Sequence, residues 1–181
     1  MRTLDKKAMN ELVRRAEQGN ASAQCNLGVL YGNGQGVPRD YAEAANWFQL
    51  AADQGNAPAQ CNLGALYRDG HGVRQDYEEA ANWFRLAADQ GVGPAQFNLG
   101  LLYLNGRGVP QDYAESCKWL NLAITRTTGE SQSKYAEVRD QLLTKMTPQQ
   151  IDDAQHLARA WKPNGTDARS TKRRATARVS G

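Results

Sequence analysis

The sequence has few of the residues on which enzymes, metal sites and disulfide-bonded domains depend. Its 181 residues include two histidines and three cysteines, and an odd cysteine count does not suit a disulfide framework. No run approaches the roughly 18 apolar residues of a membrane span, and the N-terminus lacks the apolar segment of a signal peptide. These absences predict a protein without a cofactor or a transmembrane segment, in the reducing cytoplasm.

An excess of charge of either sign is also missing from most of the chain. Residues 1–162 hold 17 Lys and Arg against 18 Asp and Glu, so the net charge of +3 comes from the tail. Segment 164–181 has one large aliphatic residue, and it cannot bury enough surface to offset the entropy of ordering, which predicts disorder. Its cations are Arg169, Lys172, Arg173, Arg174 and Arg178.

What the sequence does contain is an internal repeat of 36 residues. Segment 57–92 aligns without a gap on segment 21–56, and 26 of the 36 positions are identical. It also aligns on segment 93–128, where the pattern is recognisable as far as Ile124. A fixed period of this length is typical of a solenoid in which each repeat buries its apolar face on its neighbours.

The two ends of the repeat array are predicted to be caps. Residues 1–20 match the second half of a repeat, but Glu11 stands where the repeats have tryptophan, as suits a polar first helix. After Ile124 the period fails. Residues 129–163 are expected to form two capping helices, the second of which starts with a capping box at Thr147.

Each repeat predicts a helix A and a helix B joined by a glycine turn. A Gly-x-Gly segment follows helix A and is expected to end it, and Asp-x-x-Glu is expected to cap helix B. A mid-helix glycine is kept in all three copies, which predicts that another backbone presses against it. The residues assigned to the scaffold are Gly28, Tyr31, Trp47, Gly64, Tyr67, Trp83, Gly100, Tyr103 and Trp119.

The repeats resemble the Sel1-like repeat (SLR), a branch of the tetratricopeptide superfamily. The resemblance rests on Ala-x-Ala-Gln-x-x-Leu-Gly-x-Leu-Tyr at 57–67, Gly-x-Gly-Val-x-x-Asp at 70–76 and Ala-x-x-Trp-x-x-x-Ala-Ala at 80–88. The closing stretch 146–161 also looks like the end of many bacterial members. The resemblance implies an all-α fold, a right-handed α-α superhelix. It also implies an adaptor or scaffold that binds another protein or peptide on the concave face lined by the A helices.

Comparison of the copies separates this binding face from the scaffold. Positions that vary among the copies follow one stripe along helix A, and an asparagine kept in all copies runs beside the stripe. This amide ladder is interpreted either as a clamp for a peptide backbone or as a cap for neighbouring helices. The predicted partner-binding residues are Asn26, Val29, Asn33, Asn62, Ala65, Arg68, Asp69, Asn98, Leu101 and Asn105.

For each candidate catalytic residue a structural interpretation is stronger than a catalytic one. The protein is therefore predicted not to be an enzyme. Neither histidine belongs to a metal-ligand pattern, and His71 is expected to be solvated in its loop. Ser131-x-x-Lys134 matches one motif of penicillin-recognising enzymes, but the motifs that accompany it in those enzymes are missing. The cysteines are expected to be small buried apolar residues.

The basic tail gives the alternative function. Its cations would allow association with nucleic acid or an anionic surface, although nucleic acid is the weaker partner because few aromatics accompany them. Such binding would weaken steeply with salt and would be lost with the tail, whereas binding to the repeats would survive both changes.

Overall fold

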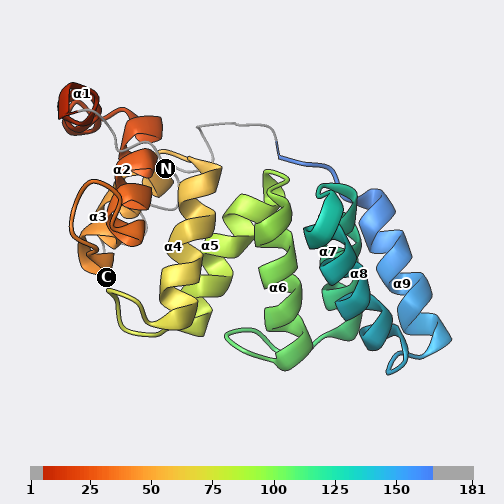
Figure 1. The fold of residues 1–181 in the computed structure, drawn as a ribbon. Helices are drawn as coiled ribbons and strands as arrows, with labels where there is room; N and C mark the ends of the chain where they lie inside the picture. Colours follow the sequence, from red (N-terminus) through yellow and green to blue (C-terminus); the bar gives the residue numbers. More distant parts are fainter. Residues whose placement is uncertain (1–5, 165–181) are drawn as a thin grey trace, which may run out of the picture. The chain divides into compact units, whose positions relative to one another are not determined.

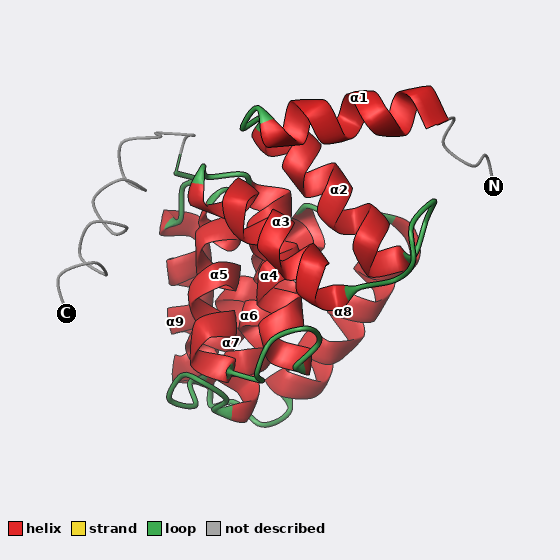
Figure 2. Ribbon diagram, turned by 90° about the vertical axis from the view of Figure 1, so that its left-hand side faces the viewer, coloured by secondary structure: helices red, strands yellow, loops and turns green. Residues whose placement is uncertain are grey.

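The computed structural model describes residues 6–164, which fold into nine α-helices and no strand (Figures 1 and 2). The predicted all-α class is therefore confirmed. Short loops join the helices, and each repeat supplies one helix A and one helix B. The helices are α1 (Lys6–Glu17), α2 (Ala21–Asn33), α3 (Tyr41–Asp53), α4 (Ala57–Asp69), α5 (Tyr77–Asp89), α6 (Gly93–Asn105), α7 (Tyr113–Thr125), α8 (Gly129–Leu143) and α9 (Pro148–Ala160).

The described residues form two compact units that divide between Gln75 and Asp76. In the first unit, α2 packs on α1, and α3 packs on both α2 and α4. In the second unit, α6 packs on α5 and α7, and α7 also contacts α8 and α9. Within each unit an A helix therefore lies against a B helix, as a stack of helical repeats requires.

Aspartate caps every B helix of the three repeats, as predicted. Each aspartate accepts hydrogen bonds from the two backbone N–H groups that follow in the first turn. The predicted contribution of the glutamate is not observed, because among the described helices only α9 has a complete capping box. Glu115 accepts from Lys118 Nζ and Trp119 Nε1, each at 3.0 Å, so it binds its own helix face instead of completing a capping box. The caps are Asp40, Asp76 and Asp112.

The Gly-x-Gly turns combine a helix cap with a contact between repeats. The first glycine ends helix A in the left-handed conformation, for example Gly70 at φ +70°. The second also has positive φ, and in the second and third repeats it lies against the first residue of the preceding B helix. A Cβ on Gly72 would overlap the carbonyl group of Tyr41, and a Cβ on Gly108 would overlap that of Tyr77. Glycine is therefore required at the second position by both conformation and space.

The residue between the two glycines stacks on the same tyrosine. The His71 ring lies 4.8 Å from the Tyr41 ring, with an angle of 19° between their planes. In the next repeat the Arg107 guanidinium lies 5.4 Å from the Tyr77 ring. His71 is exposed, as predicted, but its stacking was not expected. The loop therefore contacts the preceding repeat through a cation or ring on an aromatic face.

The mid-helix glycines make room mainly for side chains. A Cβ on Gly28 would lie 2.7 Å from ring carbons of Phe48, so the prediction of a neighbouring backbone is wrong in the first repeat. At Gly100 the nearest atoms belong to the Leu120 side chain at 3.1 Å and to the Ser116 carbonyl oxygen at 3.3 Å. The glycine thus allows helix B to place a large apolar side chain directly on helix A.

A buried glutamine joins each A helix to the B helix before it. Its Nε2 donates to the carbonyl oxygen eight residues earlier, in the last turn of the preceding helix. The same carbonyl also accepts from the backbone N–H of the glycine that follows that helix. The pairs are Gln24 with Ala16 (3.0 Å), Gln60 with Ala52 (3.1 Å) and Gln96 with Ala88 (3.1 Å). The sequence showed that this residue is repeated but did not reveal its role.

The same bond recurs after the point where the sequence period fails. Gln132 lies 36 residues after Gln96 and donates to the Ile124 carbonyl at 3.1 Å. The N-cap of α8, Thr128, likewise lies 36 residues after Val92, the N-cap of α6. Helix α8 therefore occupies the place of a fourth helix A. The repeat therefore continues in the backbone for one more helix after the repeated sequence has ended.

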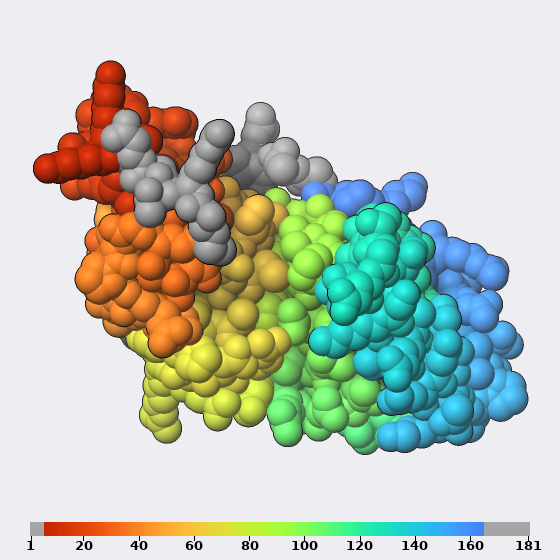
Figure 3. Space-filling model, in the orientation of Figure 1, coloured from red at the N-terminus to blue at the C-terminus, as the bar shows by residue number. Residues whose placement is uncertain are grey.

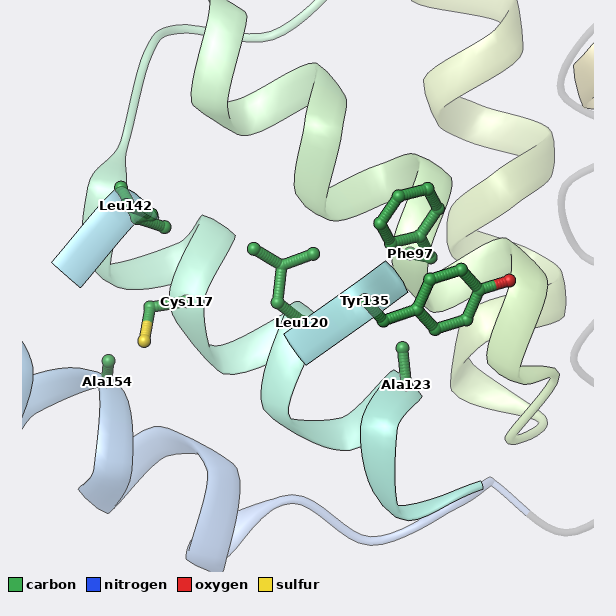
Figure 4. Close-up of a cluster of buried hydrophobic side chains, with 7 residues drawn as sticks. All are labelled: Phe97, Cys117, Leu120, Ala123, Tyr135, Leu142 and Ala154. Carbon is green, nitrogen blue, oxygen red and sulfur yellow. The ribbon is translucent and has the colours of Figure 1, made fainter. Parts of the chain in front are cut away.

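Helices α8 and α9 close the second unit with an apolar cluster. The rings of Phe97 and Tyr135 stack with centroids 3.9 Å apart, and Cys117 lies near Ala154 (Figure 4). In the space-filling view, the segment 125–145 forms a continuous turquoise-to-blue surface of this unit (Figure 3). Helix α9 starts with the predicted capping box, in which Thr147 and Gln150 exchange side-chain and backbone hydrogen bonds.

Two glycine substitutions distinguish the energetic cost of backbone strain from the cost of steric overlap. Gly19 and Gly72 both have positive φ, but only Gly72 would place a Cβ on another backbone. We expect Gly19→Ala to lower the free energy of unfolding by about 1–2 kcal/mol and Gly72→Ala by about 2–5 kcal/mol. Urea denaturation followed by circular dichroism measures both values. Equal losses would show that the loop does not lie tightly on Tyr41.

Candidate partner-binding face

On α2, the predicted residues form an uncharged, partly open face. Asn26 and Asn33 are exposed, and Val29 between them is half-buried. Cys25, on the same stripe, is 7% exposed and belongs to the core. Only the polar members of the stripe are therefore fully open to a ligand on this helix.

On α4, the stripe continues with half-buried Asn62 and Ala65 and ends in an ion pair. Arg68 donates from Nε and Nη2 to the two carboxylate oxygens of Asp69, each at 2.7 Å. This bidentate bond lowers the pKa of Asp69 because it stabilises the carboxylate. The pair presents two opposite charges that neutralise each other.

On α6, the equivalent residues contribute more to the fold. The Asn98 amide donates to the Pro94 carbonyl at 2.9 Å and the Asn105 amide to the Leu101 carbonyl at 2.8 Å, both within the helix. Leu101 is half-buried and packs on the cluster that α8 closes. The third copy of the stripe is thus partly used by the C-terminal helices.

The asparagine ladder differs from the repeated glutamines and N-cap aspartates. The glutamines and N-cap aspartates of the repeats all bond to backbone groups within the fold. Within the described range 6–164, the side chains of Asn26 and Asn62 form no hydrogen bond, and neither caps a neighbouring helix. Their amides keep their hydrogen-bonding capacity for solvent or a ligand.

The scaffold residues are placed in or beside the core. Trp83 and Trp119 are buried, and Trp47 is half-buried against α1 and α2. The mid-helix glycines are buried, while Tyr31, Tyr67 and Tyr103 are half-buried, and the Tyr103 hydroxyl accepts from Arg85 Nη2 at 2.6 Å. These residues therefore pack within the fold.

Trp161 makes a packing contact outside its own helix that the sequence did not predict. Trp161, at the end of α9, lies edge-on to Trp119 with ring centroids 6.3 Å apart, and the Arg126 guanidinium lies 4.6 Å from its ring. Beyond it, the Asn164 N–H donates to the Asp89 carbonyl at 2.8 Å. Helical spacing predicted an apolar face for α9, but no local pattern reveals this contact with α7.

The residues considered for catalysis do not assemble into a site. His71 stacks on Tyr41, and His156 is exposed on α9. Ser131 and Lys134 are both exposed on α8 and share no hydrogen bond. In the described part of the chain, no group of three or more His, Cys, Asp and Glu residues is placed to hold a metal ion.

The cysteines have the character of apolar packing residues. All three are free thiols, and Cys25 and Cys117 are buried. Burial raises the pKa of each thiol, to about 11 for Cys61 despite the opposing effect of Arg68. At neutral pH they are protonated and therefore poor nucleophiles.

Alternating A and B helices joined by glycine turns define a helical repeat protein. A sequence profile of the Sel1 repeat matches residues 21–56, 57–92 and 93–126. This is more than half of the chain, so the protein belongs to the Sel1 repeat family, and the predicted resemblance is confirmed. Repeats of this family are generally protein–protein interaction modules.

Two solved structures support this assignment. A Sel1 repeat protein from Oxalobacter formigenes is 34% identical with a TM-score of 0.67, over 75% of this chain and 56% of that chain. A protective antigen present in uropathogenic Escherichia coli strains, which displays an SLR fold, is 32% identical with a TM-score of 0.78. That match covers 96% of this chain and 36% of the antigen. The chain thus spans about half, or about a third, of these relatives. No curated protein matches.

None of the helices described between residues 6 and 164 is both long and apolar enough to span a membrane. The five cations of the basic tail lie outside the described residues.

The raised pKa of Cys61 predicts that this thiol reacts slowly with alkylating reagents. At pH 8 its thiolate fraction should be about two hundredfold lower in the folded protein, where the pKa is about 11, than in the unfolded chain, where the pKa is about 8.5. We expect iodoacetamide to alkylate Cys61 at least about 30-fold more slowly in native buffer than in guanidinium chloride. The native rate should rise with pH up to about 11. Peptide mapping by mass spectrometry measures the rate, and equal rates would contradict this placement.

Proposed function

We propose that the protein is a non-catalytic adaptor whose α2 and α4 bind an extended segment of a partner protein. The proposal rests on one observation, which is that Asn26, exposed, and Asn62, half-buried, occupy the same repeat position and form no hydrogen bond in the described part of the fold. A residue kept by repetition that neither bonds within the fold nor caps a helix suits a role in binding. The family's general function as an interaction module supports the same conclusion.

The chemistry of the asparagine side chain suits an extended peptide. Each amide offers two donors and an acceptor, so it can bond to both the N–H and the C=O of a backbone that lies along it. Such bonds hold the peptide without selecting its side chains. Selectivity then comes from the positions beside the ladder that differ between helices, such as Val29 and Ala65.

A reducing compartment such as the cytoplasm suits the three free thiols. The proposal of a non-enzyme rests on the histidines, the serine–lysine pair and the cysteines described above, none of which is both exposed and activated. The family and its structural neighbours are typically non-catalytic scaffolds, which agrees with this proposal.

A double substitution on the ladder tests the proposed face. We expect Asn26→Ala combined with Asn62→Ala to weaken partner binding about tenfold or more. Each lost hydrogen bond contributes roughly 0.5–1.5 kcal/mol. The melting temperature should change little, because neither side chain bonds within the fold. Co-purification from native lysate identifies the partner, and calorimetry with that purified partner measures the affinity.

The matched control places the same change on B helices. Asn46 and Asn82 are exposed asparagines of α3 and α5, so Asn46→Ala with Asn82→Ala removes the same chemistry elsewhere. The control should keep full affinity. If binding and stability fall together in the ladder variant, the asparagines are structural. If both variants bind normally, the partner uses another surface.

A further inference from the structure

Charged residues are nearly absent from the A helices of the three repeats. Helices α2 and α6 contain none, and α4 contains only Arg68 and Asp69, which are bonded to each other. Each B helix carries charges, such as Glu78, Glu79 and Arg85 on α5. Charge is therefore segregated by helix type, although both types have exposed positions.

Burial does not account for this absence. Seven A-helix positions are exposed, and six of them carry an uncharged side chain while the seventh is the ion-paired Asp69. An exposed helix position in water accepts Lys, Glu or Arg at no cost and with favourable helix propensity. The exposed positions are Ser22, Asn26, Asn33, Pro58, Asp69, Pro94 and Asn105.

A face without free charge selects against a charged ligand. A ligand carboxylate or ammonium that binds there loses part of its hydration, and no opposite charge on the face compensates for the loss. An uncharged peptide loses only backbone hydration, which the asparagine amides restore. Electrostatic complementarity therefore favours a neutral occupant.

We infer that the face of α2 and α4 binds an extended partner segment whose contacting residues are uncharged. The inference rests on the proposed function and adds the chemical class of the ligand. It separates this face from the basic tail, whose five cations suit acidic partners. The protein thus offers a surface whose binding does not depend on salt.

Peptide selection on the full chain tests the inference. Peptides from a random library displayed on phage are selected on the wild-type protein, and those that also bind the variant Asn26→Ala/Asn62→Ala are discarded. This step removes peptides captured by the tail. We expect the remaining peptides to lack Asp, Glu, Lys and Arg in their shared core. Their affinity should change less than about twofold between about 0.01 M and 1 M NaCl, although the Debye length falls from about 30 to 3 Å.

Charge introduced on the face provides a second readout. Ser22 is exposed on α2, so Ser22→Lys and Ser22→Glu should fold normally and should change affinity for the selected peptides in the same direction and within about twofold of each other. Opposite effects of the two charges, or a loss of affinity above about tenfold in high salt, would overturn the inference and leave the proposed binding face intact. Failure to recover any peptide that depends on the asparagines would reject the proposed function and the inference with it.

Discussion

The contact on which the repeat architecture depends is the bond from a buried glutamine to the end of the preceding helix. The last carbonyls of a helix have no donor within it, and burying them unpaired is costly. Gln24, Gln60 and Gln96 each give one of these carbonyls a second donor across a junction between helices, in addition to the backbone N–H of the glycine three residues later. The glutamine lies eight residues after its acceptor in each case, so the bond joins the same two positions at every junction. Gln132 extends this pattern to α8.

Local chemistry was readable from the sequence because its causes lie within a few residues. An aspartate before a helix, a glycine after it and the capping box at Thr147 all act through adjacent backbone groups. Contacts between distant segments were not readable in the same way. The ring of Phe48 against Gly28 requires knowledge of how two helices cross, and glycine alone indicates only that something approaches closely. His71 and Trp161 were missed for the same reason, since their aromatic partners lie 30 and 42 positions away in the sequence.

The residues of the candidate face were proposed from a comparison of the three repeats. Comparison of three copies identified the stripe because a position that varies is not held by the fold, and it identified the invariant asparagine ladder because the ladder runs beside that stripe. The method failed on α6, where Phe97 and Leu101 vary for a structural reason, which is the packing of α8. A terminal repeat meets a different neighbour from the internal ones, so its variation reflects the cap as well as any ligand. The first two copies are consequently the better guide to the binding residues.

The division of labour between the two helices of each repeat follows from these constraints. B helices carry the large apolar residues that fill the space above the mid-helix glycines, and they keep charge on their remaining surface. A helices are tied at their start by the glutamine and at their end by the glycine turn, so their exposed residues contribute little to the fold. Substitutions on that surface should cost little in stability, as the proposed role in binding requires. A repeat whose scaffold and reading surfaces are separated in this way can acquire new partners while its architecture stays the same.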